Sequence, residues 1–546
     1  MERGERGGEG KGERAFTGAR VYTQDPTRPW AGGLIVRDGR VSRLLAEGES
    51  PPSGVPTLDL SGRLVLPGFV DAHTHLTLYA RNLDRVALGG VPTLEEALAR
   101  VREAAQRTAD AVAVPDGGDW ILGQGWDPHA WGGLPDGADL ERAAPGRRIA
   151  LESRDCHACW ASAAALAAAG IGAGTPDPAG GRIVRDAAGE PTGILLEKAT
   201  RLLTAVLPRG AEGESARLER ALAEALSLGI TGVHVLDAAE GMQKLETCDR
   251  SRGLPLRVVC YLAEKDLESA LADGRRSGEQ NGRVRLGGLK LFTDGALGSR
   301  TALLSEPYEG TSDFGIAIHD DAELADLARR AAVGGLAVAI HAIGDRANTR
   351  ALDALETASA ATPAARLPLP HRIEHAQLVF PADAERFGRA GIVASVQPCH
   401  IPGDWRPADR HWGDRCAFAY PFRTLLAGGA TLALGSDVPV EGWNPFRNLY
   451  AAVARRDWDG QPSGGWHPAE ALTLREAILA CTVGSAVASG EADRRGRLTP
   501  GMDADFIALS GDLFELSPES WLELGSDLTV VGGQVVHAAE SLDPSF

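Results

Sequence analysis

The sequence predicts an α/β protein: a deformed TIM (β/α)8 barrel, a small discontinuous β-sandwich domain made of both chain ends, and an insertion after the first barrel strand. Three observations predict this fold. Apolar, β-branched segments recur eight times along the middle of the chain, mostly separated by Ala- and Leu-rich segments. Both ends consist of short strand-like segments divided by turn residues. The interval between the first two barrel strands is far too long for one crossover connection.

The two chain ends are expected to form one domain from residues 16–66 and 497–546. Asp38-Gly39 separates two apolar segments near the start, and Gly532-Gly533 does so near the end; such dipeptides are typical of hairpins. Neither end is long enough to close a core alone, so we expect them to pack together. Residues 1–15 are charged and glycine-rich, which predicts a disordered tail and not a signal peptide.

Residues 67–496 are expected to form the barrel, with an insertion at about 79–228 that carries its own elements on the rim. Strand–helix repetition eight times over suggests a (β/α)8 barrel. The eight expected strands are 64–72, 230–237, 256–263, 283–292, 336–342, 371–376, 391–398 and 431–437.

Composition excludes several classes of protein. The 546 residues are 44% hydrophobic and 24% charged, which suits a large globular core. With 56 Lys and Arg against 74 Asp and Glu, the net charge is −18, which argues against a nucleic-acid partner. The sequence contains no apolar run of about 18 residues, so we expect no transmembrane helix. The seven scattered cysteines suggest reduced thiols and a cytoplasmic protein. A homodimer is expected because it is the commonest oligomer of soluble proteins.

The strongest local signal is the H-x-H pair His73 and His75, which follows an apolar strand. Residues two apart in a strand point to the same face, so both imidazoles should aim into the mouth of the barrel. Two imidazoles at this spacing make half of a site for a divalent metal. Alone, the pair would equally fit two polar side chains at a strand end.

Four more ionisable side chains fall near the ends of other expected strands: Lys290, His341, His375 and Asp437. The carboxyl ends of barrel strands surround one point, so all six groups should converge there. Four histidines, one lysine and one aspartate form a reasonable ligand set for two cations.

The lysine has two interpretations. Two cations about 3.5–4 Å apart need a bridging anion, which a lysine amine carboxylated by carbon dioxide would supply. Neighbouring cations would lower the lysine pKa and favour the reactive neutral amine. Alternatively, Lys290 pairs with Asp294 and the site holds a single metal. The residues alone leave both readings open.

The chain resembles the amidohydrolase superfamily, specifically its amidohydrolase-3 branch, which contains N-substituted formamide deformylase-like proteins. The resemblance covers residues 16–540 and rests on an ordered series of motifs: LPGFVDAHTHL, GWDPHAW, RDCHACW, GRIVRDAAGEPTGILLE, LKLFTDGALGSRTA, AIHAIGDRA, RIEHAQ, SVQPCH, YPFRTLL, LGSDVPV and LTPGMDADFIAL. It implies the same fold, five metal ligands (His73, His75, His341, His375 and Asp437) and a carboxylated Lys290 as the bridge. One departure is Cys156, where the family usually has glycine; a thiol there would narrow the pocket or fill space.

The expected reaction is hydrolysis of a C–N bond in an amide-type small molecule, such as an N-formyl or N-acyl amine. A cation lowers the pKa of water bound to it, and Asp437 can take that proton and pass it to the leaving nitrogen. The cofactor is expected to be a divalent metal, most simply two zinc ions, with iron, manganese or nickel as alternatives. Ligand histidines need partners for their second nitrogen, and Glu374, Asp345 and Asp71 are the candidates.

Candidate substrate contacts lie in the insertion and beyond the strand ends. His157 is a catalytic and substrate-binding candidate, because it resembles a family position facing the substrate and can hydrogen-bond a carbonyl oxygen. The other candidates are Trp126, Asp127, Asp294, Arg300, Gln397 and His400, each of which has a structural role as its alternative.

Two other functions remain open. A mononuclear deaminase would use His73, His75, His341 and Asp437, with Lys290 structural. A catalytically silent barrel would bind a small molecule and regulate another process, although all six ligand positions are filled.

Overall fold

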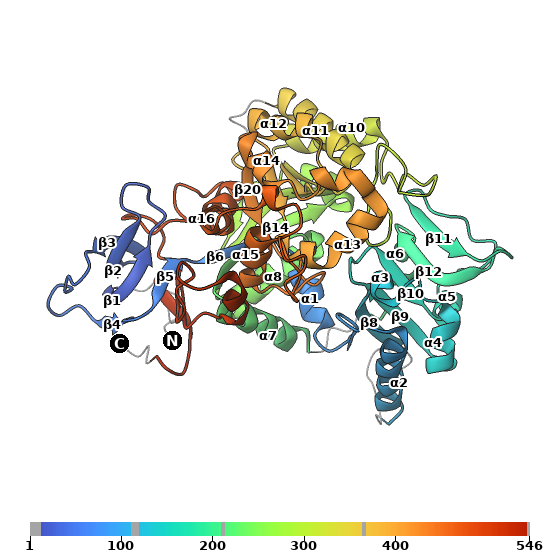
Figure 1. The fold of residues 1–546 in the computed structure, drawn as a ribbon, viewed down its shortest axis with the longest axis horizontal. Helices are drawn as coiled ribbons and strands as arrows, with labels where there is room; N and C mark the ends of the chain where they lie inside the picture. The colour runs from blue at the N-terminus through green and yellow to red at the C-terminus, as the bar shows by residue number, and fades with distance from the viewer. Residues whose placement is uncertain (1–11, 111–119, 209–212, 363–366, 543–546) are drawn as a thin grey trace.

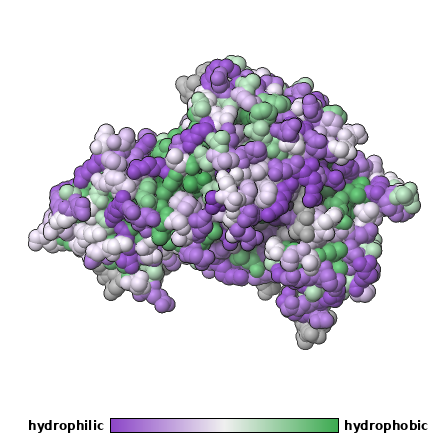
Figure 2. Space-filling view, in the orientation of Figure 1, coloured by the Kyte–Doolittle hydropathy of each residue, from purple (hydrophilic) through white to green (hydrophobic). Residues whose placement is uncertain are grey.

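The computed structural model describes residues 12–110, 120–208, 213–362 and 367–542. It has three parts that follow one another across Figure 1: a small sheet, a barrel and a second sheet on the far side of the barrel. Hydrophilic residues cover most of the face seen in Figure 2, with hydrophobic residues gathered between the small sheet and the barrel. Within the described ranges, no helix is long and apolar enough to cross a membrane.

The small sheet joins strands from both chain ends in the order β23-β22-β21-β5-β1-β2-β3, with β4 against β1. Asp38-Gly39 and Gly532-Gly533 form the two predicted hairpin turns, and all four residues have a positive φ. β1 begins inside the segment predicted to be a tail, whose residues 1–11 lie outside the described residues. The strands are β1 (Glu13–Tyr22), β2 (Trp30–Arg37), β3 (Arg40–Leu45), β4 (Thr57–Asp59), β5 (Leu64–Pro67), β21 (Phe506–Leu509), β22 (Leu528–Val531) and β23 (Gln534–Ala538).

The predicted barrel is confirmed: eight parallel strands pair in the order β20-β19-β18-β17-β16-β14-β13-β6. A bridge between Thr74 and Val438 brings the first and last strands together and nearly closes the barrel. The strands are β6 (Phe69–Thr74), β13 (Ile230–Val235), β14 (Arg257–Ala263), β16 (Val284–Phe292), β17 (Ala337–Ala342), β18 (Arg372–His375), β19 (Val393–Val396) and β20 (Thr431–Leu434).

Helices cover the outside of the barrel and bury Leu- and Ala-rich faces in its main core. They include α7 (Glu214–Ser227), α8 (Ala238–Arg252), α10 (Asp321–Val333), α11 (Asp345–Ala360), α12 (Pro381–Ala390), α14 (Phe422–Ala427), α15 (Pro445–Ala454) and α16 (Leu474–Leu479). Helix α13 (Ile401–Trp412) follows β19 and reaches toward the second sheet.

The expected first barrel strand, 64–72, is two elements. β5 belongs to the small sheet and β6 to the barrel, and Gly68 separates them. A Cβ on Gly68 would lie 2.2 Å from the Thr231 side chain, so only glycine fits this crossing.

The insertion forms a six-stranded sheet with its own core of buried residues. Its strands are β7 (Val86–Ala87), β8 (Trp120–Trp126), β9 (Arg148–Ser153), β10 (Ala158–Ala161), β11 (Gly181–Arg185) and β12 (Pro191–Glu197), accompanied by α2 (Leu94–Asp110), α3 (Pro128–Trp131), α4 (Gly137–Ala143), α5 (Ala163–Ala168) and α6 (Thr200–Thr204). Helices α1 (Leu76–Asn82) and α7 lie within the predicted insertion but pack in the barrel core. The separate sheet is therefore shorter than residues 79–228.

Charged residues hold the small sheet against the amino-terminal ends of the barrel strands. Arg257, at the start of β14, donates to Asp505 at 2.6 Å and lies 3.4 Å from Asp503. Arg495 lies 3.0 Å from Asp503. Asp505 also accepts from the Gly532 amide at 2.7 Å, so matched charges link the small sheet to this end of the barrel.

Candidate metal centre

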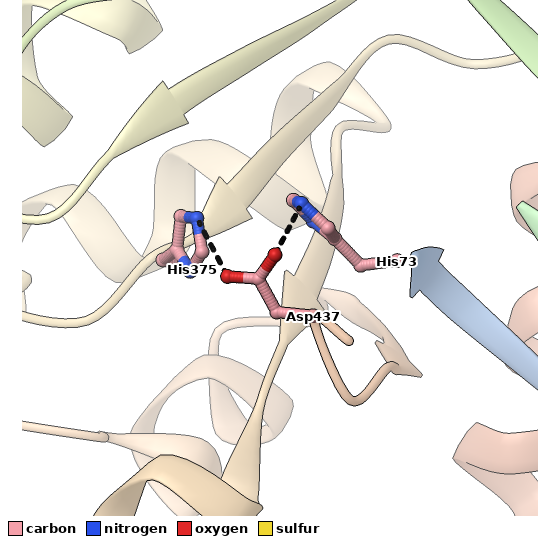
Figure 3. Close-up of side chains that lie close together, drawn as sticks. All are labelled: His73, His375 and Asp437. Carbon is pink, nitrogen blue, oxygen red and sulfur yellow. Dashed lines mark ion pairs between the residues drawn. The ribbon is translucent and has the colours of Figure 1, made fainter. Parts of the chain in front are cut away.

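The Asp437 carboxylate lies among four imidazoles at the carboxyl ends of the barrel strands. Its Oδ1 is 3.3 Å from His73 Nε2 and 3.4 Å from His75 Nε2. Its Oδ2 is 4.0 Å from His375 Nε2 and 3.9 Å from His400 Nε2. Figure 3 shows His73 and His375 facing opposite oxygens of this carboxylate.

The donor set fits a divalent cation. One ligand atom each from His73, His375 and Asp437 lies within 4.8 Å of the others. His375 is 5% exposed, and its Nδ1 has no hydrogen-bond partner within the described part of the chain. A buried imidazole nitrogen without a hydrogen-bond partner is available to a borderline metal such as zinc.

Strand ends place these side chains. His73 lies in β6, and the strand ends one residue before His75, which precedes helix α1. His375 is the last residue of β18, and Asp437 follows β20. His375 and Asp437 both have left-handed backbone, with φ of 71° and 61°. Such conformations are costly for non-glycine residues and cluster at functional sites.

Acidic side chains orient three of the histidines through Nδ1. Glu374 lies 2.7 Å from His73, Asp237 lies 3.1 Å from His75, and Glu197 lies 2.8 Å from His157. A carboxylate on Nδ1 fixes the tautomer and turns Nε2 toward a metal or substrate.

The pKa values follow burial and neighbouring charge. Burial lowers the pKa of His73 to about 4, against the opposing charges of Asp437 and Glu374. Burial also lowers that of His75, but hydrogen bonds to Asp237 and Asp437 outweigh it and raise the pKa to about 9. Burial would raise the pKa of Asp437, yet His73 and His75 hold it well below its usual range. Asp437 is therefore ionised and available as an anionic ligand.

Lys290 and His341 lie on β16 and β17, the two strands next to β18 in the order of the barrel. Lys290, in β16, is 3% exposed, and burial lowers its pKa to about 8 despite the charges of Glu374 and Asp437. His341, in β17, packs against His375 with ring centroids 4.5 Å apart. Its Nε2 lies 3.1 Å from the Gly295 carbonyl oxygen and 3.6 Å from Asp294 Oδ1.

Two cavities meet at these residues. The larger, about 270 Å³, is lined by His73, His75, Lys290 and Cys156, among others. The smaller, about 50 Å³, opens toward the insertion. Its lining includes Trp126, Asp127, Arg154 and His400. The residues common to both are Asp155, His157, His341, His375, Asp437 and Val440.

His157 comes from the insertion and lines both cavities. Burial lowers its pKa, but Glu197 outweighs this effect and raises it to about 9. The imidazole is therefore a cationic hydrogen-bond donor near neutral pH. Trp126 donates to the Leu151 carbonyl at 2.8 Å while lining the cavity, and Asp127 lies 3.4 Å from Arg154.

Three predicted substrate contacts are not among the residues that line either cavity. Arg300 lies in a tight turn, in which its amide donates to the Leu297 carbonyl. Its side chain is exposed. Asp294 is buried, where its carboxylate accepts from the Leu303, Ile343 and Gly344 amides; burial raises its pKa to about 7. Gln397 is buried and donates to the Ser395 carbonyl.

The three acidic residues that were predicted to support the ligand histidines differ in what they contact. Glu374 holds the His73 ring. Asp71 accepts from the backbone amides of His73 and Ser436, and so braces the backbone. Asp345 accepts from the amide and hydroxyl of Ser305 instead, at 2.7 Å each.

Two functional candidates escaped sequence reasoning. Asp237 ends the expected strand 230–237, so the strand-end criterion that selected Asp437 would have found it. Glu197 ends β12 within one of the motifs but had no assigned role. Cys156 has φ of 59° and lines the larger cavity, which gives the thiol a place on the pocket wall.

The fold and the site define a (β/α)8 barrel with a cluster suited to a divalent metal at its carboxyl-terminal mouth. The sequence model of the amidohydrolase family matches residues 57–537. The chain therefore belongs to the amidohydrolase family, as its motifs predicted.

Relatives span nearly the whole chain. The protein LONG AFTER FAR-RED 3 of Arabidopsis thaliana is 33% identical, over 95% of this chain and 91% of its own length. The putative amidohydrolase YtcJ of Bacillus subtilis is 34% identical, over 95% of both chains. The N-substituted formamide deformylase of Arthrobacter pascens is 30% identical, over 94% of this chain and 96% of its own.

A solved structure extends the likeness to the fold. An uncharacterised metal-dependent hydrolase from Pyrococcus horikoshii has a TM-score of 0.72 at 28% identity, covering 96% of this chain and all of that one. The family and this neighbour support a hydrolytic role for the chain that depends on a metal.

Proposed function

We propose that this protein hydrolyses a C–N bond of an amide-type small molecule, such as an N-formyl or N-acyl amine. The observation that carries the proposal is the meeting of His73, His75, His375 and Asp437 within the cavity at the barrel mouth. Divalent cations held there would polarise the scissile carbonyl and lower the pKa of a water molecule. The resemblance of the chain to an N-substituted formamide deformylase supports this substrate class.

Asp437 is the proposed proton carrier. It accepts a proton from the attacking water as the new C–O bond forms. It then delivers that proton to the leaving nitrogen as the C–N bond breaks, so the products are a carboxylic acid and an amine. One carboxylate in reach of both positions suffices for this acid–base role.

His157 is the proposed donor to the substrate carbonyl oxygen. It lines both cavities, and Glu197 on Nδ1 leaves its Nε2–H free to face the substrate. A cationic donor aimed at the carbonyl oxygen stabilises the negative charge that develops there. Trp126, Asp127 and His400 would line the rest of the substrate pocket.

Lys290 is the proposed bridge between two metal ions, most simply zinc. Its neutral amine would attack carbon dioxide, forming a C–N bond and releasing one proton, to give a carbamate with two oxygen ligands. Burial lowers the pKa of this amine to about 8, which increases the fraction of the neutral amine that the reaction needs. In the mononuclear alternative the lysine remains an amine.

Elemental analysis combined with an activity panel tests the proposal. Purified holoenzyme should contain two divalent ions per chain and release amine from one or more N-formyl or N-acyl amines. One ion per chain after careful reconstitution would favour the mononuclear reading. Metal-loaded protein that binds such amides without hydrolysing any would favour the silent barrel.

A further inference from the structure

Arg372 is completely buried inside the barrel. It begins β18, the strand that ends at His375 of the candidate metal centre. Its guanidinium joins β18 to four other strands. Besides Glu374, its partners are the Ala72 carbonyl at 2.6 Å, Ser395 Oγ at 2.7 Å, His234 Nδ1 at 2.9 Å and Tyr261 Oη at 3.4 Å. Every side of the guanidinium is therefore fixed by the barrel wall.

The contact with Glu374 is the one that reaches the site. Arg372 Nε donates to Glu374 Oε1, and Nη2 donates to Oε2 at 2.8 Å. The same Oε2 lies 2.7 Å from His73 Nδ1. A two-point contact between planar groups fixes both position and plane, which a lysine ammonium would not do.

We propose that Arg372 is a positioning residue of the metal centre: it clamps Glu374 so that this carboxylate holds His73 with Nε2 directed at Asp437. The inference rests on the metal site of the proposed function. It extends that site from the ligands and their carboxylate partners to a third layer of residues.

Packing alone does not account for this arginine. The interior of such a barrel is usually filled with apolar side chains, and replacing a buried ion pair by uncharged residues of similar size is often neutral or stabilising. A double variant, Arg372→Met with Glu374→Gln, removes both charges together. It separates the role in metal binding from the cost of leaving one charge unpaired.

The test is the affinity of the metal-free full-length protein for zinc ion, measured by competition with a chromophoric chelator. We expect Arg372→Met and the double variant to bind zinc about 10–100-fold more weakly, the usual cost of losing such support. Arg372→Lys should recover part of the affinity, since it restores the charge without the two-point contact.

Arg455 is the matched control, because it is equally buried and, among the described residues, its guanidinium donates hydrogen bonds to the main-chain carbonyls of Trp466, Tyr420 and Ala419 and to no side chain. Arg455→Met should lose stability and keep its zinc affinity within about twofold. A folded Arg372→Met or double variant with wild-type zinc affinity would overturn the proposal.

Zinc binding needs no substrate, so the two proposals fail separately. A wild-type protein that binds zinc but hydrolyses no amide sinks the proposed function and leaves the role of Arg372 intact. Full zinc affinity without Arg372 sinks this inference and leaves hydrolysis untouched.

Discussion

The two ends of the barrel treat charge and backbone in opposite ways. At the amino-terminal end, Arg257 and Arg495 meet Asp503 and Asp505 directly, and the charges match. At the carboxyl-terminal end, several imidazoles surround the carboxylate of Asp437, and a buried His375 nitrogen is left without a partner among the described residues.

Backbone strain is present at the candidate centre. Left-handed, non-glycine residues occur around the candidate centre at Cys156, Glu197, His375 and Asp437. A fold tolerates such positions where the arrangement of side chains is worth the lost stability. The comparison teaches that one end is built for stability and the other is prepared for a ligand, and it predicts that mutations at the two ends have separable effects.

The largest expected effect is that of His73→Ala. It removes a ligand candidate in contact with both Asp437 and Glu374, so bound metal and hydrolytic activity should both disappear. Elemental analysis and product release measure the two losses. A variant with full activity would count heavily against the site.

Asp437→Asn should lower the hydrolysis rate by about 10²–10⁴-fold, because the amide cannot accept the proton that the carboxylate carries. Circular dichroism should show an unchanged fold. A mild loss of rate would remove Asp437 as the proton carrier and would weaken the contrast between the two ends.

Lys290→Ala should lose most activity and regain part of it when short carboxylic acids are added, since they can occupy the place of the carbamate. The measurement is activity and metal content with and without added acid. If metal content does not change at all, the mononuclear reading gains.

At the opposite end, Asp505→Asn should lower the free energy of unfolding by about 1.5–3 kcal/mol, the usual worth of hydrogen bonds to a charged group. Zinc affinity should stay at the wild-type value. Chemical unfolding of the metal-free protein and chelator competition report the two quantities. A large loss of zinc affinity here would break the division between the ends.

The smallest expected effect concerns His319, beside Glu264 and Glu323. Burial lowers its pKa, but hydrogen bonds to the two carboxylates raise it above 6.5 overall. The stabilisation is therefore complete below about pH 6.5 and is lost as pH rises through the raised pKa. The stability difference between wild type and His319→Gln should therefore shrink as the pH rises above about 6.5; a difference that stays constant with rising pH would show that His319 does not stabilise the fold through its charge.

Repetition in the sequence was enough to predict the barrel and the strand ends that supply the site. Residues 371–376 were expected as a strand, and β18 spans Arg372–His375. The boundary between sheet and barrel was harder to find, since residues 64–72 read as one apolar segment. The need for glycine at position 68 comes from its close contact with Thr231, which lies far along the chain.

The direction in which a side chain points is what the sequence could not supply. Asp345 lies near His341 in sequence but turns to Ser305, whereas Asp237 reaches His75 across 162 positions. Arg300 follows Lys290 closely and still faces outward. Long-range hydrogen bonds decide these cases, and they depend on the assembled barrel.

The pairing of β5 with β21 has a consequence for biosynthesis. Pro67 lies opposite Phe506 in this antiparallel pair, so a ribosome must synthesise the chain past residue 506 before the small sheet can be completed. β5 runs through Gly68 directly into β6, the strand that bears His73. Contacts this distant in sequence slow folding, so nascent chains of this protein would expose an unpaired strand edge for longer than a locally connected barrel does.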